Sequence, residues 1–203
     1  IAVHGYAHES PVSLERDAES DLLDRAIARL RTVLGEAWRP VGYRSPAWDI
    51  SAATLDLLVE RGFLYDSSLM GDDFRPYRAR RGDCADEDSF RPGTPTRLVE
   101  IPVAWELDDF PYFAFINRPL FGGLRNPADV LDIWAGEFDW CHRNVESGVF
   151  TLTMHPQFIG RGPRIEMLSR LVDHMAAAGD VRFSTLAEEA LRQDGLLPAP
   201  QKG

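Results

Sequence analysis

The chain has 203 residues, of which 44% are hydrophobic, and it carries a formal net charge of −10. This length fits one domain, and the acidic balance argues against nucleic acid or an anionic membrane as a partner, because both bind clustered Lys and Arg. No apolar run approaches the ~18 residues needed to span a bilayer. No charged-then-apolar leader is visible, and Cys84 and Cys141 lack a Cys-x-x-Cys spacing, so we expect two buried, reduced thiols and a cytoplasmic location.

The first third of the chain is expected to alternate between strands and helices. Apolar residues spaced three and four apart from Leu22 to Leu34 predict one face of a helix that closes at Gly35. Ser51 is a plausible N-cap for a second helix that ends at Gly62. The strands of this part are expected at residues 1–3, 39–44 and 63–66.

A polar stretch at residues 71–96 interrupts the alternation. It contains Gly and Pro and lacks periodicity, so we expect a long loop or insertion there. Asn126 and Pro127 predict a capped helix start, and an apolar stripe continues from there to Val145. Further strands are expected at 98–103, 149–154 and 181–183, further helices at 165–179 and 186–192, and a frayed tail at 195–203.

This repeated alternation predicts a parallel sheet wrapped by helices, either a barrel or an open sheet. In such folds the chemistry collects at the carboxyl ends of the strands. Four polar clusters follow four of the expected strands. They are His4 to His8, Arg44 to Trp48, Trp105 to Asp109, and His155 to Gln157.

The histidine pair at the start of the chain is a candidate metal site. His4 and His8 are four residues apart, so a helical segment would place both imidazoles on one face. Two neutral imidazoles at that spacing can bind one divalent metal. The alternative is a pair of surface or capping histidines.

Taken together, the four clusters resemble the polysaccharide deacetylase family, which is carbohydrate esterase family 4 or the nodulation-protein-B homology domain. His4-Gly-Tyr-Ala-His8 is similar to its His-x-x-x-His metal motif, and Arg44-Ser-Pro-Ala-Trp48 to its Arg-x-Pro-x-Trp motif. His155 stands where its late histidine motif is expected. The segments around His155 and Trp105 resemble the peptidoglycan-deacetylase-like branch, whose relatives also act on cyclic imides or ureides.

The resemblance implies a distorted (β/α) barrel that lacks its first strand–helix unit of ~30 residues. The catalytic domain would cover residues 1–194 and the flexible tail residues 195–203. The family's first motif carries a metal-binding Asp and the catalytic base, and no residue before His4 matches it. The cofactor is expected to be a divalent metal, Zn²⁺ first, held by His4, His8 and an Asp upstream of residue 1.

The resemblance also implies roles for the other polar residues. His155 is the candidate general acid that protonates the leaving amine; the alternative is a histidine packed beneath Pro156. Arg44 would hold a carboxylate, either the upstream base or a later acid. Asp108 and Asp109 are the visible later acids, and one of them would steer His155 or contact substrate, unless the pair only marks a turn.

Substrate-binding candidates surround these groups. Trp48 and Trp105 are expected to wall a pocket, because aromatic faces pack on sugar or planar imide rings. Pro46 belongs to the same motif as Trp48, and Arg161 would close the pocket or bind an anionic group. Buried core positions for the tryptophans and a plain surface loop for Arg161 are the alternatives.

The expected function is metal-dependent hydrolysis of a non-peptide C–N bond. The leading form of this reaction is N-deacetylation of an N-acetylated amino sugar or polysaccharide. A cyclic imide or ureide hydrolase of the same fold is one alternative. A catalytically inactive module that binds sugar or a partner chain is the other. The expected partners are a small-molecule or glycan substrate and a second copy of the chain in a homo-oligomer, with no nucleic acid and no membrane.

Overall fold

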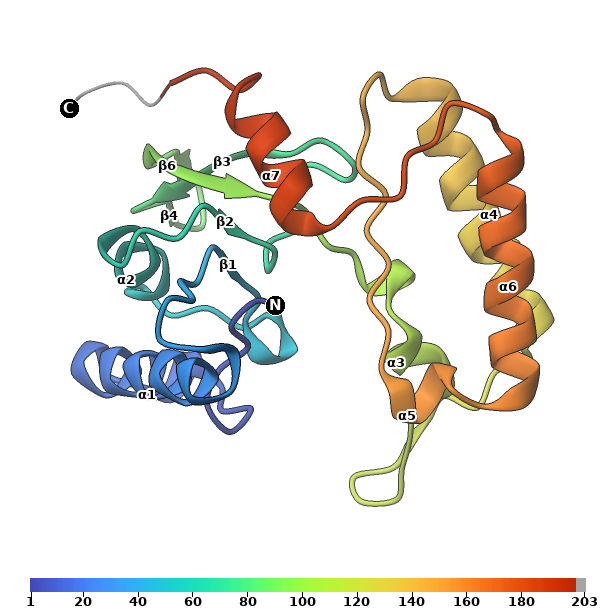
Figure 1. Ribbon diagram of the computed structural model, residues 1–203, viewed down its shortest axis with the longest axis horizontal. Helices are drawn as coiled ribbons and strands as arrows, with labels where there is room; N and C mark the ends of the chain where they lie inside the picture. Colours follow the sequence, from blue (N-terminus) through green and yellow to red (C-terminus); the bar gives the residue numbers. More distant parts are fainter. Residues whose placement is uncertain (200–203) are drawn as a thin grey trace. The chain divides into compact units, whose positions relative to one another are not determined.

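The computed structural model describes residues 1–199, and its contacts divide the chain into two compact units (Figure 1). The first unit contains residues 1–71 and 76–102 and the segment from Ser184 onward, and the second contains Asp72–Arg75 and Val103–Phe183. In the described part of the chain, no helix has both the length and the apolar character to cross a membrane. Each unit has its own hydrophobic core, so each is described by itself.

The first unit is built on a four-stranded sheet in the order β1-β2-β6-β3. Strands β1 (Gly42–Tyr43), β2 (Tyr65–Asp66) and β6 (Thr94–Glu100) are parallel, and β3 (Tyr77–Arg81) is antiparallel to β6. Val3 forms a parallel bridge with Tyr43, so the expected strand end before His4 lies beside β1. The parallel sheet agrees with the α/β class expected from the alternation of elements.

Three helices complete this unit: α1 (Arg16–Leu34), α2 (Thr54–Glu60) and α7 (Leu186–Asp194), with short 3-10 turns η1 (Pro11–Ser13) and η2 (Pro46–Trp48). The apolar stripe of α1 is buried in one core with residues of α2 and the sheet, as its periodicity predicted. Ser51 Oγ accepts hydrogen bonds from the backbone N–H groups of Ala53 and Thr54, so Ser51 does cap the start of α2.

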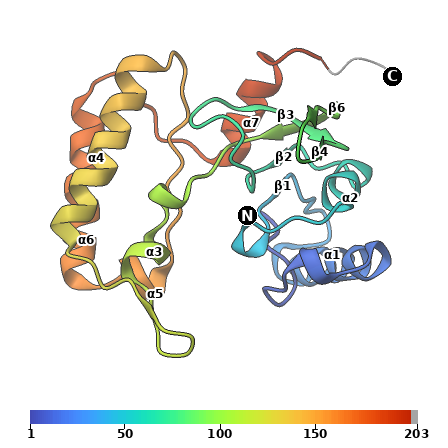
Figure 2. The same cartoon turned by 180° about the vertical axis from the view of Figure 1, so that it is seen from behind.

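The second unit packs helix α4 (Pro127–Asn144) against α6 (Gly162–Ala177), which lie side by side in Figures 1 and 2. Trp134 on α4 is fully buried, and its indole N–H donates to the Glu106 carbonyl over 2.8 Å. Asn126 caps α4 through the Ala128 N–H, as expected. The remaining elements are η3 (Trp105–Leu107), α3 (Asp109–Phe113), α5 (Pro156–Ile159) and the hairpin β7 (Phe115–Ile116) and β8 (Phe121–Gly122).

The expected loop at 71–96 is wrong for part of its length. It contains β3, the short hairpin strands β4 (Cys84–Ala85) and β5 (Phe90–Arg91), and the start of β6. In β3 the charged Arg78, Arg80 and Arg81 outnumber the apolar residues and mask the strand pattern, yet Ala79 is fully buried. Charged side chains are a usual feature of edge strands, and β3 is the edge of this sheet. Both cysteines were expected to be buried. Cys141 is buried, but Cys84 is exposed on β4.

Two strands expected in the second unit do not form. Residues 149–154 are extended, but their only ladder contact is an isolated bridge between Thr153 and Asp108, and residues 181–183 form no strand. The backbone of the first segment bonds to non-strand partners instead, with Val149 N–H donating to the Phe74 carbonyl. The apolar run at residues 149–154 therefore indicates extended backbone, but this backbone pairs with no strand named above.

The C-terminal segment is partly held in place. Arg78 donates from Nη1 to Asp194 over 2.6 Å and from Nε to the Pro198 carbonyl over 3.2 Å. The tail expected at 195–203 is therefore anchored at Pro198, and residues 200–203 lie outside the described part. The single catalytic domain expected over residues 1–194 stays a prediction.

The close approach of β1 and β2 gives a stability prediction. Gly42 is the register partner of Tyr65, and a Cβ at residue 42 would lie 1.9 Å from the Tyr65 ring. We expect Gly42→Ala to lower the free energy of unfolding by about 1–3 kcal/mol, because the ring must move out of its packed position. Urea unfolding of the full-length protein measures this.

Gly136→Ala is the matched control. Gly136 lies inside α4 with no atom near a new Cβ, so this substitution should stabilise the helix by ~0.5–1 kcal/mol. Equal effects of the two substitutions would contradict the packing described for β1 and β2.

Candidate functional site

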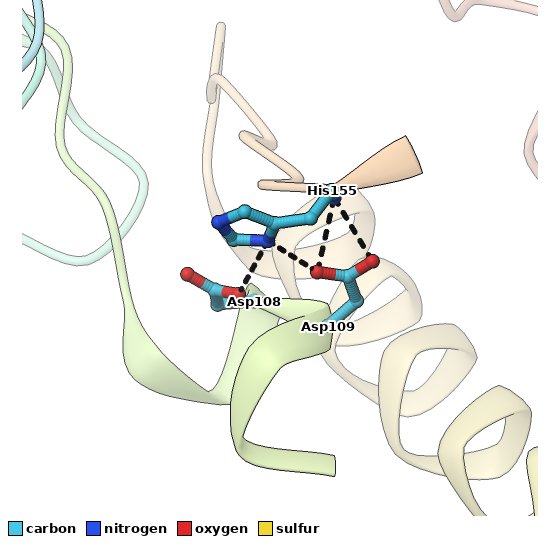
Figure 3. Close-up of side chains that lie close together, drawn as sticks. All are labelled: Asp108, Asp109 and His155. Atoms are coloured by element: carbon cyan, nitrogen blue, oxygen red, sulfur yellow. Dashed lines mark hydrogen bonds and ion pairs between the residues drawn. The ribbon is translucent and has the colours of Figure 1, made fainter. Parts of the chain in front are cut away.

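The candidate residues gather in two groups, one in each unit. His4, His8 and Arg44 lie together in the first unit. Asp108, Asp109 and His155 lie together in the second (Figure 3). Each group is built below from the segments that hold it.

A tight turn, not a helix, brings His4 and His8 together. Gly5 has φ +65° and His8 has φ +62°, so the helical geometry considered for residues 4–8 is wrong. The Glu9 carboxylate closes the turn by accepting hydrogen bonds from the backbone N–H groups of Tyr6 over 2.9 Å and Ala7 over 2.6 Å. Burial raises the pKa of Glu9, but these backbone hydrogen bonds outweigh it, so the pKa lies below its usual value.

The two imidazoles of this turn are arranged as metal ligands would be. His4 Nδ1 lies 2.7 Å from the Arg44 carbonyl oxygen, which can only accept, so Nδ1 carries the proton and Nε2 is left as a ligand atom. The ring centroids of His4 and His8 are 5.2 Å apart and the rings are edge-on. Two imidazoles on one tetrahedral ion at the usual Zn–N distance of ~2.0–2.1 Å have centroids roughly 5 Å apart, so this pair fits a shared divalent ion.

Arg44 is held by the segment that follows β2. Its Nε donates to the Ser67 carbonyl over 2.9 Å and its Nη2 to Ser67 Oγ over 2.6 Å. The next residues form the turn η2, in which Ala47 and Trp48 both have positive φ. A Cβ at Gly5 would lie 2.9 Å from Pro46 Cγ, so η2 packs directly on the histidine turn. Two adjacent left-handed residues without glycine are uncommon and are characteristic of functional segments.

In the second unit, Asp109 holds His155 at three points. Its Oδ1 lies 2.6 Å from His155 Nδ1, and both carboxylate oxygens accept from the His155 backbone N–H, at 3.1 and 3.0 Å (Figure 3). Asp109 is fully buried, whereas the His155 side chain is 32% exposed. Asp108 is farther away, with Oδ1 at 3.6 Å from Nδ1, and that oxygen caps α3 through the Phe110 N–H.

This arrangement follows from the bridge between residues 108 and 153. Thr153 N–H donates to the Leu107 carbonyl and Asp109 N–H donates to the Thr153 carbonyl. The bridge places Asp109, the first residue of α3, beside His155, which directly follows the extended segment. The rings of Phe110 and Phe158 flank His155, with centroids at 6.0 and 5.7 Å.

Two kinds of chemistry are open to this group. Its three residues each offer a ligand atom within 4.8 Å of the others, so the group could hold a metal ion. The 2.6 Å contact between Nδ1 and the carboxylate instead makes an oriented acid–base pair, since a metal at Nδ1 would have to displace it. In that pair Asp109 fixes the ring and Nε2 is the atom that can exchange a proton.

The candidate substrate-binding residues differ in exposure. Trp105 is 44% exposed on η3 and offers a face for a ligand, whereas Trp48 is only 8% exposed and Pro46 is buried. Arg161 is exposed at the N-cap of α6.

Sequence reasoning missed the residues that support these groups. Ser67, which holds Arg44, carries no signal in the sequence, because serines after a strand are common. Glu9 likewise carries no signal in the sequence for its role in closing the histidine turn. Asp66 and Glu100 are fully buried, and Glu100 could have been noticed as a carboxylate inside the apolar run from Leu98 to Val103.

Comparisons with known proteins agree in pointing to one family. A scan against protein-family models finds no match. The chain is 36% identical, over 214 aligned positions, to a protein of Helicobacter pylori named peptidoglycan deacetylase, and covers 72% of it. The crystal structure of a candidate polysaccharide deacetylase from Mycobacterium smegmatis matches 100% of the chain with a TM-score of 0.80 at 35% identity, and the chain covers 66% of it.

A more distant structure shares only the fold. The crystal structure of an allantoinase matches 96% of the chain with a TM-score of 0.74 at 22% identity, and the chain covers 59% of it. The chain thus spans between about three fifths and three quarters of the proteins it matches. The architecture predicted from the four motifs, a distorted (β/α) barrel of the polysaccharide deacetylase type, is confirmed by the two structural matches.

The hydrogen bonds fix a testable set of histidine tautomers. In metal-free full-length protein, ¹⁵N NMR should show the neutral rings of His4 and His155 protonated at Nδ1, because that atom faces an acceptor in each. His142 and His174 serve as internal controls, because their Nε2 atoms face Asp180 and Asp139 over 2.6 and 2.7 Å and should carry the proton. Protonation of His155 at Nε2 would contradict its orientation by Asp109.

Proposed function

Because this chain belongs to the polysaccharide deacetylase family, we propose that the whole protein N-deacetylates an amino sugar of a peptidoglycan-type glycan. The chain is a hydrolase of a carbon–nitrogen bond other than a peptide bond. The reaction on the glycan breaks the amide bond, adds water, and releases acetate and a free amine. A glycan substrate is supported by the name of the Helicobacter pylori relative.

The observation that carries the proposal is the pairing of His155 with the buried Asp109 over 2.6 Å. A deacetylase must protonate the leaving nitrogen, and an imidazole fixed through Nδ1 can do this from Nε2. The negative charge of Asp109 stabilises the protonated ring that donates. His155 is therefore assigned as the general acid and Asp109 as the residue that orients it.

The histidine turn is assigned to metal binding. His4 and His8 would hold a divalent metal through Nε2 of His4 and one ring nitrogen of His8, with a third ligand from an Asp upstream of residue 1. A metal held there would supply Lewis-acid chemistry for the acetyl carbonyl and for the attacking water. Zinc is the first choice, although cobalt, nickel and iron suit the same ligand types.

The remaining residues bind and position. Arg44 stays protonated at every relevant pH, so it cannot act as a base and is assigned to holding a carboxylate in place. Trp48 and Pro46 in the first unit, and Trp105 and Arg161 in the second, are the residues proposed to contact substrate. Asp108 is assigned to shaping the start of α3 through its cap on the Phe110 N–H.

The first test measures bound metal and hydrolysis together on the full-length protein. N-acetylglucosamine oligomers should release acetate in proportion to metal content. His4→Ala should lose both metal and activity, whereas His142→Ala on α4 should keep both, because its ring lies outside the two groups.

Two other outcomes would replace the proposal. Opening of a simple cyclic imide without acetate release would assign the protein to imide or ureide hydrolysis. A full-length protein that binds glycan with neither activity would be an inactive binding module.

The two acids beside His155 should differ in how strongly their substitution lowers kcat. Asp109→Asn removes the charge that bonds Nδ1 and is expected to lower kcat by about 10²–10⁴-fold, with a smaller change in KM. Asp108→Asn is the matched change at 3.6 Å and keeps a capping oxygen, so its effect should be at least tenfold smaller. Steady-state kinetics at saturating metal decide it. Equal losses in the two variants would show that Asp109 has no special role.

A further inference from the structure

Two carboxyl groups, those of Asp66 and Glu100, lie side by side in the core of the first unit. Asp66 ends β2 and Glu100 ends β6, and they are register partners in the parallel pair, so their side chains share one face. Both are fully buried. The reaction proposed above uses neither of them.

The oxygens of this pair are satisfied on one side only. Asp66 Oδ1 accepts from Ser68 Oγ over 2.7 Å, and Glu100 Oε1 accepts from the Ser68 and Leu69 backbone N–H groups, each over 2.9 Å. Asp66 Oδ2 and Glu100 Oε2 are buried, and no N–H or O–H of residues 1–199 donates to either. Buried acceptors without a donor are costly, and a proton in the hydrogen bond between the Glu100 and Asp66 carboxyls relieves that cost.

The charges around the pair favour a single proton. Burial raises the pKa of Glu100 well above its usual value, and the neighbouring charge of Asp66 adds to the rise. Burial also raises the pKa of Asp66, while its hydrogen bond with Glu100 and the charge of Arg44 oppose that rise. Both directions favour a pair that keeps one proton between its two carboxyls.

The other titratable groups that face the pair stay in one charge state near neutral pH. Burial raises the pKa of Tyr43 on β1 to about 12. Burial likewise raises the pKa of Tyr65 on β2 and of Tyr77 on β3. The phenols therefore remain neutral and Arg44 remains charged, which leaves the two carboxyls as the groups that titrate here.

The pair is linked to Arg44 by a short chain of hydrogen bonds. Glu100 and Asp66 hold Ser68, and Ser68 Oγ accepts from the Ser45 N–H over 2.9 Å. The adjacent Ser67 binds the Arg44 guanidinium and donates to the Ile101 carbonyl over 2.7 Å. The backbone and the side chain of the Arg44–Ser45 segment therefore both rest on residues 67 and 68.

The same chain of contacts reaches the histidine turn. The Arg44 carbonyl accepts the proton of His4 Nδ1. A shift of residues 67 and 68 would therefore move the Arg44 guanidinium and the acceptor that orients His4.

We propose that Asp66 and Glu100 share one proton and act as positioning residues that set the placement of Arg44 and, through its carbonyl, of His4. This inference rests on the proposed deacetylase function, in which Arg44 holds a carboxylate and His4 a metal. Loss of the shared proton would place two negative charges side by side in the core, and the resulting repulsion would displace Ser67 and Ser68.

The sign of the pH effect follows from the raised pKa of Glu100. The unfolded chain releases this proton near the usual carboxyl pKa, whereas the folded chain retains it, so folding takes up a proton in between. Stability from this pair is complete at low pH and falls as pH rises towards the raised value. Glu100→Gln mimics the protonated form, so the variant should not show this fall.

The first experiment detects the proton directly in the full-length protein. Infrared difference spectroscopy at pH 7 should show the C=O stretch of one buried carboxylic acid, and Glu100→Gln should remove it. The matched control, Glu36→Gln at an exposed carboxylate, should leave the band unchanged. Absence of the band in the wild-type protein, or its survival in Glu100→Gln, would overturn the shared proton.

The second experiment tests positioning. Glu100→Ala should shift the ¹⁵N signal of Arg44 Nε and lower kcat by about 10- to 100-fold. Glu100→Gln should preserve the Arg44 signal and keep kcat within about threefold of wild type, because its amide replaces the shared proton. An Arg44 signal that does not move in Glu100→Ala would overturn the positioning role, even in an active enzyme. If Glu100→Ala does not fold, the Arg44 Nε signal decides: it must shift at alkaline pH in the wild-type protein and must not shift in Glu100→Gln.

These readouts separate the inference from the function it rests on. The infrared band and the Arg44 signal do not require catalysis. A wild-type protein that releases no acetate would overturn the proposed function alone.

Discussion

The candidate chemistry of the first unit depends on the backbone pairing of Val3 with β1. Val3 N–H donates to the Gly42 carbonyl and Arg44 N–H donates to the Val3 carbonyl, which places residues 4 and 44 at the same edge of the parallel sheet. This pairing lets the Arg44 carbonyl fix the tautomer of His4. The carboxyl ends of parallel strands meet at one edge, so residues far apart in sequence become neighbours there.

Behind this edge the protein buries charge instead of avoiding it. Asp66 and Glu100 occupy positions where apolar side chains would pack at lower cost. The hydrogen bonds of the pair converge on Ser68 and Leu69, which directly follow Ser67, the residue that accepts hydrogen bonds from Arg44. A polar core of this kind gives a defined geometry at an energetic cost, and the role proposed for Arg44, holding a carboxylate, requires a defined geometry.

The second unit orients its histidine by the same physical means. A buried carboxylate, that of Asp109, holds one nitrogen of His155 and leaves the other to the exposed side of the ring. The backbone support is smaller, because one isolated bridge replaces a strand ladder. Two further backbone hydrogen bonds from the His155 N–H to Asp109 compensate for the shorter pairing by fixing both ends of the residue.

The sequence by itself determined helices α1, α2, α4, α6 and α7 and pointed to the candidate site residues. The stripe of α1 and the Asn126 cap of α4 are local signals, since periodicity and capping involve residues within a few positions of one another. The pairs His4–His8 and Asp108–Asp109, with Arg44 and His155, were likewise readable as polar residues after apolar runs. The family that these residues suggested is the one shown by the 36% identical relative.

Only the tertiary structure decided how these groups are held. The turn at Gly5 replaced the expected helix because Glu9 closes it, and the charged strand β3 formed because β6 offered it a partner. Asp66 and Glu100 are 34 positions apart, and nothing local reveals that β2 and β6 bring them into register. Register between distant strands depends on how the whole sheet packs. Only the folded structure therefore shows that these two carboxyl groups are neighbours.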